Sequence, residues 1–153
     1  MLYIIRKGDS VPSHLLVAIE AIDWPAGTYV ADILRQQSMA PSDYYFILSQ
    51  DSPDANKKDQ LVAFAAYVEQ DIIADPAICP CIATVYVEPS FRQRGLSRDL
   101  VHLVELHAKA QNQQDLYINT QHQGLYEPLG YQQFDCQIDT KGRTIYLYHK
   151  TLY

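Results

Sequence analysis

The sequence predicts one α/β domain spanning residues 1–153, with a mixed central sheet of about six to seven strands flanked by helices. Three observations predict this class. The length fits a single domain, and 48% hydrophobic with 20% charged residues is an ordinary globular composition. Segments rich in β-branched and aromatic residues alternate with helical patterns. The nearly continuous apolar segment 78–87 is typical of a central strand that is covered on both faces.

The N-terminal part predicts a strand followed by two helices. Residues 2–6 are apolar and β-prone and precede a Gly-containing turn. Ser13 is placed to cap a helix whose apolar residues recur at helical spacing as far as Ile22. A second, weaker helical pattern covers 27–37.

The remaining elements follow in chain order. We expect strands at 44–48 and 61–68, the central strand at 78–87, a long helix from Gly95 to about 111–114, a strand at 116–119, a short helix at 124–129 and a terminal antiparallel pair at 131–138 and 144–149. The long helix is supported by apolar residues at helical spacing. The polar stretch 49–59 joins the first two of these strands as a hairpin loop.

The segment from Arg92 to Ser97 has the features of a phosphate cradle. It leads from an apolar strand into the first turn of a helix, where backbone N–H groups lack intrahelical partners and the helix dipole is positive. Gly95 lets the backbone approach an anion closely, and Arg92 and Arg94 add positive charge. We therefore expect an anion, and by its extent a pyrophosphate, to bind here.

These residues also carry a family resemblance. Read as Arg-x-x-Gly-x-Ser after Val-x-Pro, the segment resembles motif A of the GNAT superfamily, the acyl-CoA-dependent N-acetyltransferases. Ser97 departs from the usual small apolar residue at the last position. The downstream segment Leu125–Tyr131 is similar to motif B of the same superfamily. The order of predicted elements also resembles the GNAT fold from end to end.

The resemblance implies how acetyl-CoA would be held. The backbone of Val85, Tyr86 and Val87 would pair with the pantetheine arm as an added strand, and an N–H there would polarise the thioester carbonyl. The residues that it implies for cofactor binding are Val85, Tyr86, Val87, Arg92, Gln93, Arg94, Gly95, Leu96, Ser97, Asn119 and His122. The co-substrate would be acetyl-CoA, without a metal.

The resemblance also implies the catalytic residues. Tyr126 matches the position whose hydroxyl faces the sulfur of CoA, and its implied role is the general acid that protonates the departing thiolate. The general base is less defined, with Glu69, Asp71, Glu20 and His122 as candidates. Glu69 is preferred because it lies near the end of the strand beside the motif A strand.

Composition limits the partners. A formal net charge of -6 argues against nucleic acid, and no apolar segment is long enough to span a bilayer. The three cysteines, Cys79, Cys81 and Cys136, fit neither a disulfide framework nor a metal site. We expect a cytoplasmic protein that acts on a small-molecule or peptide amine. The aromatic segment 144–153 would offer a strand edge for a homodimer.

The resemblance thus implies an N-acetyltransferase that works by direct attack in a ternary complex. Two alternatives stay open. One is a GNAT-like domain that binds CoA without catalysis, as a sensor or interaction module. The other is an unrelated α/β domain whose segment 92–97 binds a different phosphate.

Overall fold

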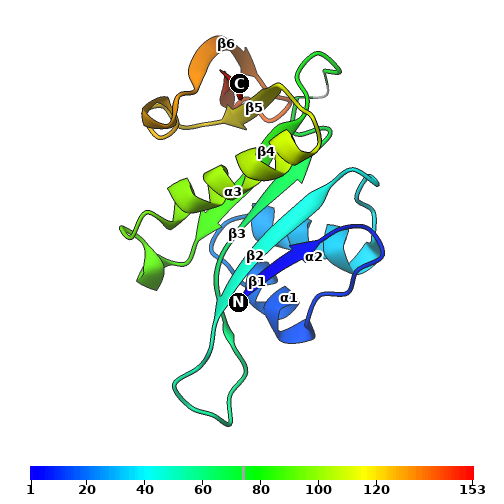
Figure 1. Ribbon diagram of the computed structural model, residues 1–153, viewed down its shortest axis with the longest axis vertical. Coiled ribbons are helices and arrows are strands. Elements are labelled where there is room, and N and C mark those ends of the chain that lie inside the picture. Colours follow the sequence, from blue (N-terminus) through cyan, green and yellow to red (C-terminus); the bar gives the residue numbers. More distant parts are fainter. Residues whose placement is uncertain (74) are drawn as a thin grey trace.

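The structure is a computed structural model that describes residues 1–73 and 75–153. Its central feature is one seven-stranded sheet (Figure 1). The elements are β1 (Leu2–Ile5), α1 (Ser13–Glu20), α2 (Ala26–Gln36), β2 (Tyr44–Gln50), β3 (Gln60–Val68), β4 (Cys81–Val87), the 3-10 helix η1 (Pro89–Phe91), α3 (Leu96–Ala110), β5 (Asp115–Thr120), the 3-10 helix η2 (Glu127–Leu129), β6 (Gln132–Ile138) and β7 (Thr144–Thr151). The α/β class and the strand number expected from the sequence are confirmed.

The strands are arranged in the order β1-β2-β3-β4-β5-β7-β6. The strands from β1 to β4 are connected as an antiparallel series, whereas β4 and β5 run parallel and need the crossover helix α3. The chain then returns antiparallel through β7, with β6 outside it. As the apolar pattern indicated, β4 occupies the centre of the sheet.

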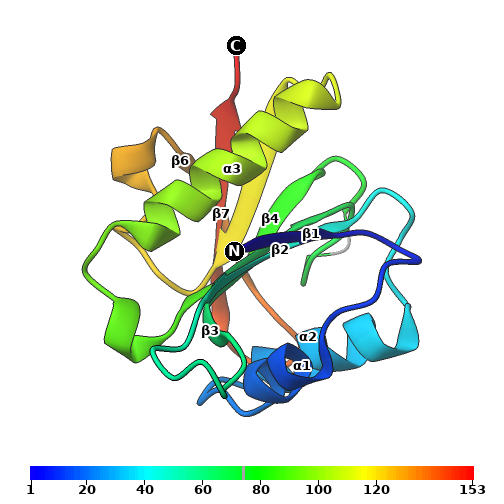
Figure 2. The same ribbon diagram turned by 60° about the horizontal axis from the view of Figure 1, so that its bottom comes forward.

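Helices cover both faces of the sheet (Figure 2). On one face α1 and α2 bury Leu15, Ile19 and Val30 against the sheet. On the opposite face α3 buries Leu100 and Val104. The apolar residues of α3 recur every three or four positions because only that spacing keeps them on the side of the helix that faces the strands. The two cores share the central strands, so β3 and β4 are covered from both sides.

Three local details differ from the sequence-based expectations. Pro12, not Ser13, is the N-cap of α1, and its side chain makes no capping hydrogen bond. The strand expected from 78 begins at Cys81, after the cis peptide bond between Cys79 and Pro80. The short helix expected at 124–129 is reduced to the single 3-10 turn η2, because Pro128 lacks the N–H that a longer helix would use.

The C-terminal edge of the sheet also differs. Segment 144–153 was expected to offer a free edge, but β7 pairs with β5 on one side and β6 on the other. The edge strand is β6, whose residues are almost all exposed. Within residues 1–73 and 75–153, no helix has both the length and the apolar character required to cross a membrane.

Candidate active site

β4 and β5 separate at the centre of the sheet. Their register is given by two pairs, Cys81 with Tyr117 and Ile82 with Ile118. Beyond them, β4 continues to Val87 and β5 to Thr120 without a further pair between these strands in the described residues. The edge of β4 that faces β5 therefore leaves backbone groups available to an extended ligand, the geometry of an added strand.

The separation coincides with a distortion in β4. Thr84 has a φ of 51°, in the left-handed region that β-branched residues rarely adopt. The β3–β4 register shifts at the same place, between Phe64 and Ala66. The Thr84 hydroxyl oxygen is buried and, among the described residues, has no hydrogen-bond partner. Such bulges redirect a strand, and this one directs the end of β4 away from β5.

The cradle predicted at 92–97 has the backbone form of an anion nest. Gln93 and Gly95 both have positive φ, 64° and 75°, which turns neighbouring N–H groups toward a common centre. Gly95 is the N-cap of α3 and has no side chain to satisfy the first N–H groups of the helix. These N–H donors follow soon after the free edge of β4 in the chain, so one ligand can contact the strand edge and the donors together.

The two arginines of the cradle are exposed and held near the turn. Arg92 Nε donates to the Val87 carbonyl oxygen at 2.9 Å, and its guanidinium lies 5.7 Å from the centre of the Tyr86 ring. The Arg94 guanidinium lies 5.3 Å from the centre of the Phe91 ring. Both charges are available to an anion on the nest.

Tyr126 lies at the N-cap of η2, half-buried in the core on the α3 side. Its ring centre is 6.3 Å from those of both Tyr131 and Tyr148. Burial, with a smaller contribution from the negative charge of Asp71, raises the pKa of Tyr126 to about 12. The hydroxyl therefore keeps its proton at neutral pH, as a general acid requires.

Asp71 lies after β3, and its negative charge acts on Tyr126 and Cys81. Burial raises the pKa of Asp71 to about 6, against hydrogen bonds from the Ile72 backbone and the Asn119 side chain that lower it. Burial raises the pKa of the Cys81 thiol, and the charge of Asp71 adds to this shift as it does to that of Tyr126. A carboxyl group with this pKa is divided between its two protonation states near neutrality.

Asn119, expected to contact the cofactor, lies on β5 beside this carboxylate. It is 8% exposed, and its amide nitrogen lies 3.8 Å from Cys81 Sγ. Its amide oxygen has no hydrogen-bond partner among the described residues. A buried acceptor without a partner costs free energy, and a donor on a bound ligand would remove that cost.

Two other residues named from the sequence lie at the surface. Glu69 comes one residue after β3, is exposed, and donates its backbone N–H to Asp43 Oδ1 at 2.9 Å. It lines a cavity of about 230 Å³ together with Tyr29, Tyr45 and Asp43. His122 is exposed in the turn after β5, where its backbone N–H donates to Thr120 Oγ1.

The predicted cofactor residues on β4 divide between its faces. Tyr86 points to the α1–α2 side and stacks between Phe64 and Trp24, at 5.4 and 6.1 Å between ring centres. Val85 and Val87 pack on the α3 side. The backbone edge, rather than the side chains, is therefore the part of this segment that is offered to a ligand.

Sequence reasoning missed Thr84. A threonine in an apolar strand gives no local signal of positive φ, because the bulge depends on how β3 and β4 pair.

An acyl-CoA fits this set of donors. The nest and arginines suit a pyrophosphate, and the free edge of β4 suits an extended amide-containing arm. The unpartnered atoms of Thr84 and Asn119 lie on β4 and β5, just beyond the last pair between these strands. In the described part of the chain, no cluster of three or more His, Cys, Asp and Glu residues is arranged to hold a metal ion.

Solved structures with the same fold include several acetyltransferases. An aminoglycoside 6'-N-acetyltransferase from Enterococcus faecium superposes with a TM-score of 0.68 at 16% identity, covering 100% of this chain and 97% of that one. A GNAT family acetyltransferase from Elizabethkingia anophelis with acetyl-CoA bound gives 0.65 at 15% identity, with 99% and 97% covered. The ribosomal-protein-S18-alanine N-acetyltransferase from Escherichia coli gives 0.62 at 19% identity, with 99% and 94% covered.

A search of curated proteins finds no match to this chain. The sequence does match a family model. The model described as "Acetyltransferase (GNAT) family" matches residues 13–131, well over half of the chain, from the start of α1 to the second residue after η2. This range contains the separation of β4 and β5, the cradle and Tyr126. The chain therefore belongs to the GNAT family of acetyltransferases.

Proposed function

We propose that this protein is an N-acetyltransferase, which moves an acetyl group from acetyl-CoA to a primary amine by direct attack in a ternary complex. The observation that carries the proposal is the free edge of β4, with the cradle at its end and Tyr126 beyond β5. This arrangement can hold an acyl-CoA and supply an acid near its sulfur. Family membership supports the same chemistry.

The chain would hold the donor mainly through its backbone. The segment 92–97 would bind the pyrophosphate, and the edge of Val85–Val87 would pair with the pantetheine amides. A backbone N–H in the same stretch would stabilise the negative charge that develops on the carbonyl oxygen. Acetyl-CoA supplies an activated acetyl thioester, and orienting it against the amine is worth about 7 to 11 kcal/mol of the barrier.

Two groups would move the protons. Tyr126 donates its hydroxyl proton to the departing CoA sulfur as the carbon–sulfur bond breaks. Asp71 accepts the proton that the ammonium group loses before its nitrogen forms the new carbon–nitrogen bond. As the intermediate collapses, the nitrogen loses its second proton, which restores the Tyr126 hydroxyl. Tyr126 keeps its proton and Asp71 releases one near neutrality because burial raises both pKa values from different starting points.

Glu69, preferred as the base from its sequence position, is a second candidate. It is exposed, whereas Asp71 is coupled by charge to Tyr126 and interacts with Asn119. We therefore place the base at Asp71. In this arrangement Glu69 would contact the acceptor from the cavity that it shares with Tyr29 and Tyr45.

We propose that the acceptor is an amine of a small molecule or of a protein, the two kinds of substrate named for the solved structures. The aminoglycoside enzyme acts on a small molecule and the S18-alanine enzyme on a protein substrate. The cavity beside Glu69 contains two tyrosines and Asp43, a lining that suits a cationic amine. The free cysteines fit a reducing compartment, and we propose the cytoplasm as the location.

Replacing Tyr126 with Phe tests the proposal. A panel of polyamines, aminoglycosides, amino acids and lysine peptides, scored by release of free CoA, first identifies an acceptor. With that acceptor, Tyr126→Phe should lower kcat about 10²-fold, because removing a general acid typically costs this much. Binding of acetyl-CoA, measured by calorimetry, should stay unchanged.

Tyr153→Phe is the matched control, since its hydroxyl contacts the Lys109 carbonyl oxygen at the other end of α3. It should keep full activity. Acetyl-CoA binding without transfer to any acceptor would instead support a catalytically silent CoA-binding module. Binding of ATP but not of acetyl-CoA would overturn the proposal.

A further inference from the structure

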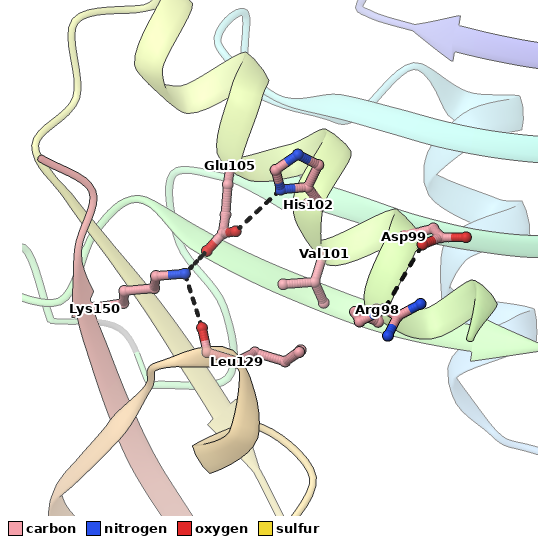
Figure 3. A pocket seen from close by; sticks show the side chains of 7 residues that line it. All are labelled: Arg98, Asp99, Val101, His102, Glu105, Leu129 and Lys150. Carbon is pink, nitrogen blue, oxygen red and sulfur yellow. Dashed lines mark hydrogen bonds and ion pairs between the residues drawn. The ribbon is translucent and has the colours of Figure 1, made fainter.

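A buried carboxylate lies on α3, apart from the cradle and from Asp71. Glu105 is 7% exposed and accepts two hydrogen bonds on Oε2. Tyr131 OH donates at 2.9 Å and Lys150 Nζ at 2.7 Å. Figure 3 shows Glu105 of α3 and Lys150 of β7 pointing toward each other, with Leu129 next to the lysine.

The same lysine joins α3 to the turn that carries Tyr126. Lys150 Nζ also donates to the Leu129 carbonyl oxygen at 2.8 Å, and it lies 5.4 Å from the centre of the Tyr131 ring. Glu105 is thus linked to η2 through Lys150. It also contacts Tyr131, the residue after Gly130, directly. Both contacts lie within five residues of Tyr126 in the chain.

The two attachment points are themselves hydrogen-bonded to Tyr126. The backbone N–H groups of Leu129 and Tyr131 donate to the Tyr126 carbonyl oxygen at 3.0 and 3.2 Å. Holding Leu129 and Tyr131 against α3 therefore also fixes the backbone of Tyr126. α3 is the helix whose N-terminus forms the cradle, so this network sets the acid relative to the donor site.

Gly130 shows how closely the lysine passes this turn. A Cβ atom at Gly130 would lie 3.2 Å from Lys150 Cε, and its φ of 96° is unfavourable for any other residue. The lysine side chain thus passes close to the turn, and a side chain at position 130 would require it to shift.

We propose that Glu105 and Lys150 are positioning residues, which hold Tyr126 at the distance from the cradle that proton transfer to the CoA sulfur requires. The inference rests on the function proposed for Tyr126. Stability alone explains a buried ion pair poorly, because well-packed apolar residues of similar volume are often equally stabilising. The hydrogen bonds that Glu105 and Lys150 make with the turn are directional, so together they hold the turn in one geometry.

An open cavity lies beside the contacts of Glu105 and Lys150. A cavity of about 350 Å³ lies between α3 and η2 and is lined by Arg98, His102, Glu105, Leu129 and Lys150, among others (Figure 3). His102 Nδ1 lies 3.8 Å from Glu105 Oε1 on its rim. Glu105 and Lys150 both line this open cavity, so their contacts connect α3 and η2 at its edge.

The first test measures the hold on the turn without any substrate. The double variant Glu105→Leu with Lys150→Met removes both charges together, so that neither remains buried and unpaired. Amide hydrogen exchange in 124–131 should become about tenfold faster, while exchange in β2 and β3 stays unchanged. Arg143→Met is the control, because it removes the 2.6 Å ion pair with Asp139 in the β6–β7 turn.

The second test measures catalysis. The double variant should lower kcat by about tenfold to 10²-fold with little change in acetyl-CoA binding, the scale expected for a small misplacement of a catalytic group. In a Tyr126→Phe background the same two changes should cause no further loss, because they act through the Tyr126 hydroxyl. If the double variant instead lost structure in general, its fold-decrease in kcat would multiply that of Tyr126→Phe.

The outcomes separate the two proposals. Unchanged exchange in 124–131, or losses that multiply with Tyr126→Phe, would overturn the positioning role. If Tyr126→Phe itself leaves kcat unchanged, the role proposed for Tyr126 fails, while the exchange experiment still reports on the network. Should the double variant not fold, Tyr131→Phe removes one hydrogen bond to Glu105 and must show the same direction in both measurements.

Discussion

At the scale of single residues, burial gives two ordinary side chains their proposed roles. Tyr126 and Asp71 both have raised pKa values, about 12 and about 6, and in both the largest cause is burial. The tyrosine therefore remains protonated over the whole useful pH range. The carboxyl group, in contrast, changes its protonation state near neutrality. Pairs of groups with well-separated pKa values are typical of acid–base catalysis.

Asp71 should set the acid limb of the pH profile. A base works only when deprotonated, so kcat/KM for the acceptor should fall as pH decreases through about 6. Asp71→Asn should lower kcat/KM about 10²-fold at pH 7.5 and remove this limb. Glu69→Gln is the comparison. A limb that stays with Asp71→Asn and disappears with Glu69→Gln would move the base to Glu69.

Asp71 should also lower stability at high pH. Its pKa is raised from 3.8 in the unfolded chain to about 6, so the folded state binds more protons between these values. Its contribution is favourable below about pH 4 and is lost as pH rises through 6. Asp71→Asn should therefore raise the free energy of unfolding at pH 8 but not at pH 4, as measured by urea denaturation. A difference independent of pH would contradict the burial of this carboxyl.

At the scale of elements, the proposed donor site depends on the way β4 leaves β5. The parallel pairing ends at Ile82 and Ile118, and Thr84 adopts its positive φ directly afterwards. The strand then runs through η1 into the nest at the start of α3. The free strand edge and the cradle are thus consecutive parts of one continuous segment, which accounts for their alignment.

The unpartnered hydroxyl of Thr84 should cost stability in the free protein. Thr84→Val keeps the shape and the β-branching but removes the buried oxygen, so the free energy of unfolding should rise by about 1 kcal/mol. Thr120→Val is the matched control with the opposite sign. It removes the acceptor of the His122 N–H and should lower the same quantity by about 1 kcal/mol. A destabilised Thr84→Val would show that the hydroxyl has a partner.

At the scale of the whole molecule, the helix and the sheet are joined by an unusual aromatic contact. The His107 ring of α3 lies among Tyr44, Tyr67 and Phe46 of the strands, at 4.1, 4.9 and 5.7 Å between ring centres. Burial lowers the pKa of His107 below 6.5. Burial therefore favours the neutral imidazole at this contact.

This histidine should make the fold sensitive to acid. The unfolded chain binds a proton at pH 6.5 that the folded protein accepts only at lower pH, so its contribution is intact above 6.5 and is lost as pH falls. The free energy of unfolding of His107→Phe, relative to the native chain, should increase between pH 7.5 and 5. A constant difference across this range would mean that His107 protonates without resistance in the folded state.

Much of the fold could be predicted from the sequence, because its determinants are local. The long α3 follows from apolar residues at helical spacing, and the cradle from Gly95 between a strand and a helix. The Tyr126 segment was identified by its own short motif. Family membership confirms the overall arrangement. The details that differed, such as the N-cap at Pro12 and the shortened η2, are boundary residues where competing local preferences are nearly equal.

The sequence by itself determined the order of elements, the glycine turn at the start of α3 and the acetyltransferase family. Tertiary structure alone decided which carboxyl group interacts with Asn119 and raises the pKa of Tyr126, where β4 leaves β5, and that Glu105 meets Lys150 across two layers. Periodicity and turn chemistry are properties of neighbouring residues, whereas pKa shifts and ion pairs depend on which distant segments burial brings together.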